Sequence, residues 1–211
     1  MSATIKQKFA DARIAITNTL ASEDIQKRLN GFGFNQRRMQ DGNGLLDQVT
    51  QLTALQEDKY GAYYDSTDAF YQELEQIKER HRRHRKVALI AYEGNRSMAL
   101  KLRLKGETKK ITDTIDRIST FYDTLAKDSS GIAAYGITPE EIAQTRAMIQ
   151  SMIDLRSQQI ARKGEAQHAT QQRDQALRQL NNWMKDFRYA ARFALRDEPQ
   201  LLEVVGIKVP S

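Results

Sequence analysis

Apolar and polar side chains recur along most of this chain with the spacing of an α-helix. From Leu46 to Leu102, alternating steps of three and four residues fall mainly on apolar side chains. This stripe has the seven-residue period of helices that pack lengthwise against one another. Its positions are Leu46, Val49, Thr53, Gln56, Tyr60, Tyr63, Thr67, Phe70, Leu74, Ile77, His81, His84, Ala88, Ala91, Asn95, Met98 and Leu102. The pattern predicts a long helix.

Beyond Leu104 the stripe changes phase. A shift of this kind bends or locally unwinds a coiled coil without ending it. Glycine also closes many helices, and one stands at Gly94 and another at Gly106. The helix over 45–127 is therefore either continuous or broken at Gly94 or Gly106. The stripe resumes at Ile111, Ile115, Ile118, Tyr122 and Leu125.

A second long helix is predicted from Thr138 to about Leu195. Thr138 can cap the helix, Pro139 suits its first position, and the acids that follow complement the positive helix end. A glycine-containing loop over 128–138 separates the two long helices. The apolar positions of the second helix are Ile142, Ile149, Ile153, Ile160, Leu177, Leu180, Met184, Phe187 and Ala191.

If 128–138 is a hairpin loop, opposite residues have numbers that add up to about 266. This register places Phe187 near Glu79 and Trp183 near Arg83. It also leaves the apolar positions of 45–70 beyond the reach of the second helix. The N-terminal helices or a second copy of the chain would have to cover them.

The rest of the chain completes an all-α architecture: an elongated antiparallel helical bundle, or long coiled-coil hairpin, with short N-terminal helices. Residues 1–40 hold two short helices, over 3–20 and 23–30, with Ser22 as the cap of the second, and a loop containing glycine. The helical hairpin or bundle occupies 41–197. The tail 198–211 leaves the last helix at Pro199 and packs back through Leu201, Leu202, Val204, Val205 and Ile207.

Composition narrows the class of protein. A content of 40% apolar residues suffices for a core, and no apolar run approaches the roughly 18 residues that cross a membrane. The first residues lack the pattern of a secretory signal, so we place the protein in the cytoplasm. The chain contains no cysteine, which excludes disulfides, thiol nucleophiles and thiolate metal sites.

Charge is concentrated in one segment. The basic run comprises six cationic side chains against one acid, Glu79, a net charge of +5 in a chain whose total is +6. It either binds a polyanion weakly and without sequence preference, or forms a solvated helix face whose long side chains cover apolar surface. The six residues are Lys78, Arg80, Arg82, Arg83, Arg85 and Lys86.

His81 and His84 interrupt the apolar stripe within this run. Their spacing could present two imidazoles to a metal, and Glu165 with His168 has the Glu-x-x-His spacing of di-metal bundles. That motif occurs once, so we interpret the histidines as polar layers that fix register and expect no metal and no cofactor. Burial and neighbouring arginines should hold the pKa of both imidazoles below 6.5.

No motif supports catalysis. The stretch GFGFNQ lacks the third glycine of a dinucleotide site, and DGNG at 41–44 has too few spaced oxygens for calcium. We expect a non-enzymatic structural or interaction protein that self-associates or scaffolds, a homo-oligomer without a small-molecule substrate. Tyr60, Tyr63 and Phe70 would carry self-association. The alternative is a binding module whose basic run docks on nucleic acid or an anionic membrane surface.

Overall fold

The computed structural model describes residues 4–106 and 110–209, and within these ranges it contains eight helices and no strand. The predicted all-α class is confirmed. The helices are α1 (Ile5–Ala21), α2 (Glu23–Asn30), α3 (Gln36–Ala91), α4 (Arg96–Lys101), α5 (Ile111–Lys127), α6 (Ser130–Ala133), α7 (Pro139–Ala194) and α8 (Pro199–Val204).

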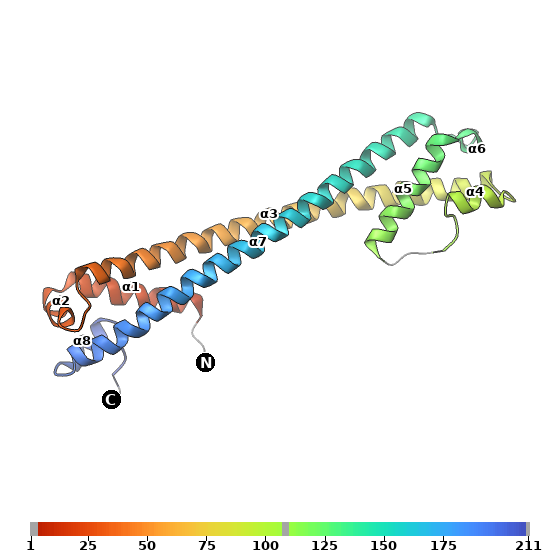
Figure 1. Ribbon diagram of the computed structural model, residues 1–211. Coiled ribbons are helices and arrows are strands. Elements are labelled where there is room, and N and C mark those ends of the chain that lie inside the picture. The colour runs from red at the N-terminus through yellow and green to blue at the C-terminus, as the bar shows by residue number, and fades with distance from the viewer. Residues whose placement is uncertain (1–3, 107–109, 210–211) are drawn as a thin grey trace. The chain divides into compact units, whose positions relative to one another are not determined.

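Helices α3 and α7, of 56 residues each, pack as an antiparallel hairpin (Figure 1). Polar contacts fix their register: Gln56 donates to Thr170 over 3.3 Å, and Gln159 donates to Thr67 over 3.1 Å. The residue numbers of both pairs add up to 226. The predicted sum of about 266 is therefore wrong.

The register differs because α3 ends at Ala91. Gly94 follows in the left-handed conformation, with φ of +78°, and Asn95 then caps α4 by accepting from the Met98 N–H. The break that the sequence left open therefore lies at Gly94. A second left-handed glycine, Gly106, precedes α5. The loop over 128–138 joins α5, not α3, to α7, so the segment 92–138 does not lengthen the first arm of the hairpin.

The chain divides into two compact units, and both boundaries fall within the long helices. The first unit holds the described residues up to Tyr60 and those from Glu165 onward. The second unit holds Gly61–Gly164. Each unit has its own apolar core, so each is described separately.

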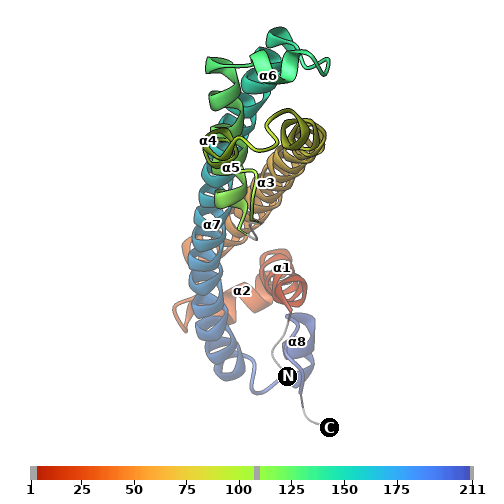
Figure 2. The same cartoon turned by 90° about the vertical axis from the view of Figure 1, so that its right-hand side faces the viewer.

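In the first unit, α1, α2 and α8 pack around the ends of α3 and α7. Ser22 accepts from the Ile25 N–H and caps α2, as predicted. The tail packs back as expected, with Leu202, Val205 and Ile207 buried, although Val204 is exposed. Asn18 of α1 donates to the Val204 carbonyl over 2.6 Å, and Figure 2 shows α1 beside α8.

The first unit's core contains a contact between a glycine and a tryptophan. Trp183 stacks on Phe187 at a centroid distance of 5.4 Å and donates its indole N–H to the Arg38 carbonyl over 3.1 Å. A Cβ added at Gly42 would lie 2.3 Å from the Trp183 ring. Trp183 therefore lies against α3 at Gly42, whereas the sequence placed it near Arg83.

In the second unit, the chain turns back after α4, and α5 then packs against α3 and α7, running in the same direction as α3. Its inward side chains follow helical spacing at Ile118, Phe121, Tyr122 and Leu125. They share a core with Phe70, Leu74 and Ile77 of α3 and with Ile142, Ile149 and Met152 of α7. This three-helix core positions the basic run and the two histidines of the apolar stripe, His81 and His84.

Candidate functional site

The six cationic side chains of the basic run project from α3 in different directions. Lys78, Arg82 and Arg85 stand at helical intervals on one side and line a single cleft. Arg80 points instead to α7, where it donates to Gln144 over 3.2 Å. Arg83 and Lys86 are exposed. The structure thus brings together half of the predicted anion-binding residues.

The opposite wall of this cleft belongs to α5. Ile111, Thr114, Arg117 and Ile118 face α3 across a volume of about 470 Å³. Arg117 is a cationic side chain that the sequence analysis missed. The sequence places Arg117 next to the apolar stripe of α5. Only the reversal of the chain after α4 brings this side chain to the basic run. We call this space, lined also by Glu75, His81 and Gly106, the basic cleft.

The charges of the basic cleft are poorly balanced. Among the lining residues that the structure describes, Glu75 is the only carboxylate, 3.3 Å from the Lys78 ammonium and 3.9 Å from the Arg82 guanidinium. Arg85 donates to the Leu104 carbonyl and Arg117 to the Gly106 carbonyl. A carbonyl accepts a hydrogen bond but carries no net charge, so both guanidinium charges persist. The described lining residues, four cations and one anion, give the cleft a charge of +3.

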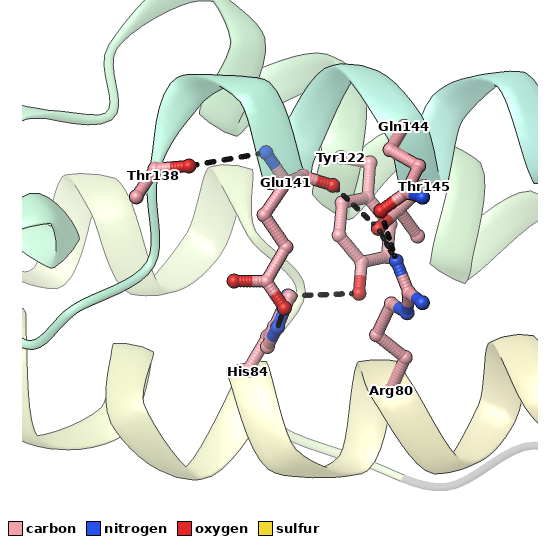
Figure 3. Close-up of polar contacts among 7 residues, drawn as sticks. All are labelled: Arg80, His84, Tyr122, Thr138, Glu141, Gln144 and Thr145. Atoms are coloured by element: carbon pink, nitrogen blue, oxygen red, sulfur yellow. Dashed lines mark hydrogen bonds and ion pairs between the residues drawn. The ribbon is translucent and has the colours of Figure 1, made fainter.

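The apolar stripe of α3 forms a seam along which this helix packs against its neighbours. His81 and His84 lie on this seam, as predicted. His84 is 4% exposed, and its Nε2 and Nδ1 lie 3.1 Å from the Glu141 carboxylate and 3.0 Å from the Tyr122 hydroxyl (Figure 3). His81 packs edge-on against Phe121 at a centroid distance of 4.8 Å. The carboxylate beside His84 is Glu141 of α7.

Both imidazoles titrate below their ordinary range, which confirms the predicted direction. Burial lowers the pKa of His81 to about 4, and the charges of Arg85 and Arg117 add to the effect. Burial also lowers the pKa of His84, although the Glu141 carboxylate opposes the shift. Burial raises the pKa of the Tyr122 phenol. At neutral pH, the Glu141 carboxylate therefore lies beside a neutral His84, and His84 lies beside a neutral Tyr122.

This protonation state determines which atom donates and which accepts in each hydrogen bond. The Glu141 carboxylate can only accept, so His84 Nε2–H donates to it and His84 Nδ1 accepts from the Tyr122 hydroxyl. A carboxylate, an imidazole and a hydroxyl in series can pass a proton toward a substrate, but Tyr122 is 0% exposed. No substrate reaches its oxygen in this conformation. We assign the group to fixing the positions of α3, α5 and α7 around the core.

Replacing Tyr122 with phenylalanine is expected to destabilise the second unit by roughly 1–2 kcal/mol. The change leaves the buried His84 Nδ1 without its donor, and an unsatisfied buried polar atom costs about that much. Chemical denaturation should show a lower midpoint with an unchanged slope. Tyr135→Phe, at an exposed tyrosine of the same unit, is the matched control and should change the midpoint little. Equal effects of both changes would contradict the assigned hydrogen bond.

The remaining sequence candidates are dispersed. His168 is exposed on α7 in the first unit, while His81 and His84 belong to the second. Among the described residues, no three His, Asp or Glu side chains are grouped to hold a metal ion. Within residues 4–106 and 110–209, no helix is both apolar and long enough to cross a lipid bilayer.

The residues proposed for self-association lie largely within the chain's own packing. Phe70 is 0% exposed in the core of the second unit, and Tyr60 and Tyr63 are half-buried. The corrected register removes the reason for expecting an uncovered stripe, because Leu46, Val49 and Phe70 are buried in the cores that include α7. Self-association stays a prediction, without the argument that first supported it.

Comparison with known proteins adds no relative: no family model, curated protein or solved structure matches this chain.

Proposed function

We propose that this protein is a binding module that holds an anionic partner in the basic cleft of its second unit. One observation carries the proposal: four cations from two helices converge on one cleft whose described lining residues include a single carboxylate. Four like charges in one cleft repel one another. A negative ligand in the same space offsets this repulsion, so its binding is favourable.

The surrounding segment strengthens the attraction. Residues 78–106 contain ten Lys or Arg and two acids, a net charge of +8. Among the described residues, Lys78 and Arg82 share one carboxylate, Glu75, whereas Arg80 pairs with neutral side chains and Arg85 with a carbonyl. Arg103 does meet an acid, Asp116. The field of the whole segment therefore draws anions toward the cleft.

The test is binding to heparin across a salt series. If the net charge of the cleft governs binding, about three counterions are released, and affinity should fall roughly 40-fold between 50 and 200 mM salt. Lys78→Glu/Arg82→Glu should abolish the interaction at low salt, because it reverses two charges of the cleft.

The matched control is Arg178→Glu/Lys185→Glu, which changes net charge equally on exposed positions of α7 in the first unit. This variant should keep most of the affinity. Equal losses in both double variants would show that total charge, not the cleft, drives binding. No heparin binding by the parent at low salt would overturn the proposed function.

A further inference from the structure

The walls of the basic cleft are of two kinds. Arg85, Arg117, Lys78 and Arg82 supply positive charge, and Ile111 and Ile118 supply an apolar surface. A volume of about 470 Å³ lies in the range of pockets for small organic ligands. A ligand that matches both surfaces has a compact anionic group and an apolar body.

The guanidinium groups favour phosphate as the anionic group. Hydrogen bonds to the Leu104 and Gly106 carbonyls hold Arg85 and Arg117 in place before any ligand arrives. Arginine presents several N–H donors in a planar fork, so bonds to a carbonyl leave others for phosphate oxygens. The Arg117 Nε–H is buried and has no acceptor among the described residues. Fixed donors bind a phosphate without first losing side-chain entropy.

His81 lines the same cleft, and its charged neighbours are nearly all positive. Lys78, Arg82 and Arg85 flank it on α3, and Arg117 approaches from α5. Among the described residues, the nearby acids are Glu75, paired with Lys78 and Arg82, and Glu141 of α7, which faces His84 rather than His81. The His81 Nε2 atom is buried without a hydrogen-bond partner among the described residues.

We propose that the basic cleft binds a phosphate monoester of a small organic group, and that in mild acid His81 takes up a proton when the ligand binds. This inference rests on the proposed function and specifies the ligand. Burial, reinforced by the neighbouring cations, keeps His81 neutral in the free protein, and an anion in the cleft compensates the field of those cations. Protonation of His81 then adds a further cation beside the ligand.

Nuclear magnetic resonance of the imidazole C–H signals tests the proton uptake directly. The chain has three histidines, so His81→Gln, His84→Gln and His168→Gln assign the signals. Sulfate is the first probe, because it stays a dianion throughout the titration and takes up no proton itself. Saturating sulfate should raise the His81 midpoint from about 4 by at least about one pH unit. The His168 midpoint should not move with sulfate beyond the effect of equal ionic strength in chloride.

Affinity measurements test the ligand class. Phenyl phosphate should bind more tightly than inorganic phosphate, because its ring can cover the half-buried Ile111. Glu75→Gln should tighten phenyl phosphate binding roughly 2- to 5-fold, because it removes the one anion among the described residues of the cleft wall. Arg178→Gln, which removes a charge from the first unit, should leave this affinity unchanged.

The source of the phosphate is decided by vesicles of phosphatidylcholine with phosphatidic acid, whose headgroup is a phosphate monoester. Vesicle binding that phenyl phosphate displaces identifies a lipid headgroup. Phenyl phosphate binding without vesicle binding identifies a soluble ligand.

The inference fails if sulfate leaves the His81 midpoint unchanged, or if phenyl phosphate binds no better than inorganic phosphate. Either result is compatible with salt-sensitive heparin binding that Lys78→Glu/Arg82→Glu removes. The ligand proposal and the proposed function can therefore fail separately.

Discussion

Replacing Gly42 with alanine is expected to lower the free energy of unfolding by about 2–3 kcal/mol. Alanine would ordinarily stabilise a helix by up to about 1 kcal/mol relative to glycine. Here the added methyl group would stand 2.3 Å from one Trp183 ring carbon and 2.5 Å from another. The indole has little freedom to move away, because it is stacked on Phe187 and hydrogen-bonded to the Arg38 carbonyl.

The control lies two residues further along the same helix. A Cβ added at Gly44 meets nothing within 4 Å. Gly44→Ala should therefore raise stability by roughly 0.5–1 kcal/mol, the opposite sign from Gly42→Ala. Urea denaturation of the parent and both variants measures the difference. Stabilisation by both alanines would contradict the packing of Trp183 against α3.

Mild acid is expected to destabilise the second unit, by about 2 kcal/mol from His81 alone between pH 7 and pH 5. The imidazole has a pKa near 6.5 in the unfolded chain and of about 4 in the folded protein. Folding therefore favours the neutral form. This contribution to stability is complete above pH 6.5 and is lost as the pH falls toward 4. The lowered pKa of His84 acts in the same direction.

The measurement compares unfolding free energies at pH 7 and pH 5 for the parent, His81→Gln and His168→Gln. Glutamine at position 81 removes the titrating group, so the loss on acidification should shrink by about 2 kcal/mol. His168 is exposed on α7, and its replacement should leave the loss as in the parent. Identical losses in all three proteins would show that His81 does not share the buried environment described above.

The periodicity of the sequence predicted the long helices and the seam through His81 and His84, but not the pairing of α3 with α7. An apolar stripe that repeats every seven residues matches another such stripe equally well at many offsets. The stripe therefore carries little information about register. One offset is distinguished from another only by residues of unusual size. Here these are Gly42, which has no side chain, and Trp183, whose large ring packs against it. Placing these two residues together would have given a sum of 225 instead of 266.

The same limit explains which part of the candidate site was missed. The basic run is continuous in sequence and was evident from composition. Arg117, Tyr122 and Glu141 join it only because the chain breaks at Gly94 and turns back after α4, which brings α5 against α3. Gly94 and Gly106 were both recognised as helix breakers, and both take left-handed conformations. Local signals could mark these ends, but the direction of the chain after each end depends on packing between distant residues.

The carbonyl-bound arginines divide the cations of the basic cleft into two chemical kinds. Lys78 and Arg82 face Glu75 as charges, and either lysine or arginine could fill those positions. Arg85 and Arg117 each bind a carbonyl of the connection between α4 and α5 while keeping donors for a ligand. A lysine ammonium is a point charge without the planar fork. Exchange of arginine for lysine should thus be tolerated at 78 and 82 but not at 85 and 117, although the charge of the cleft is the same in every case.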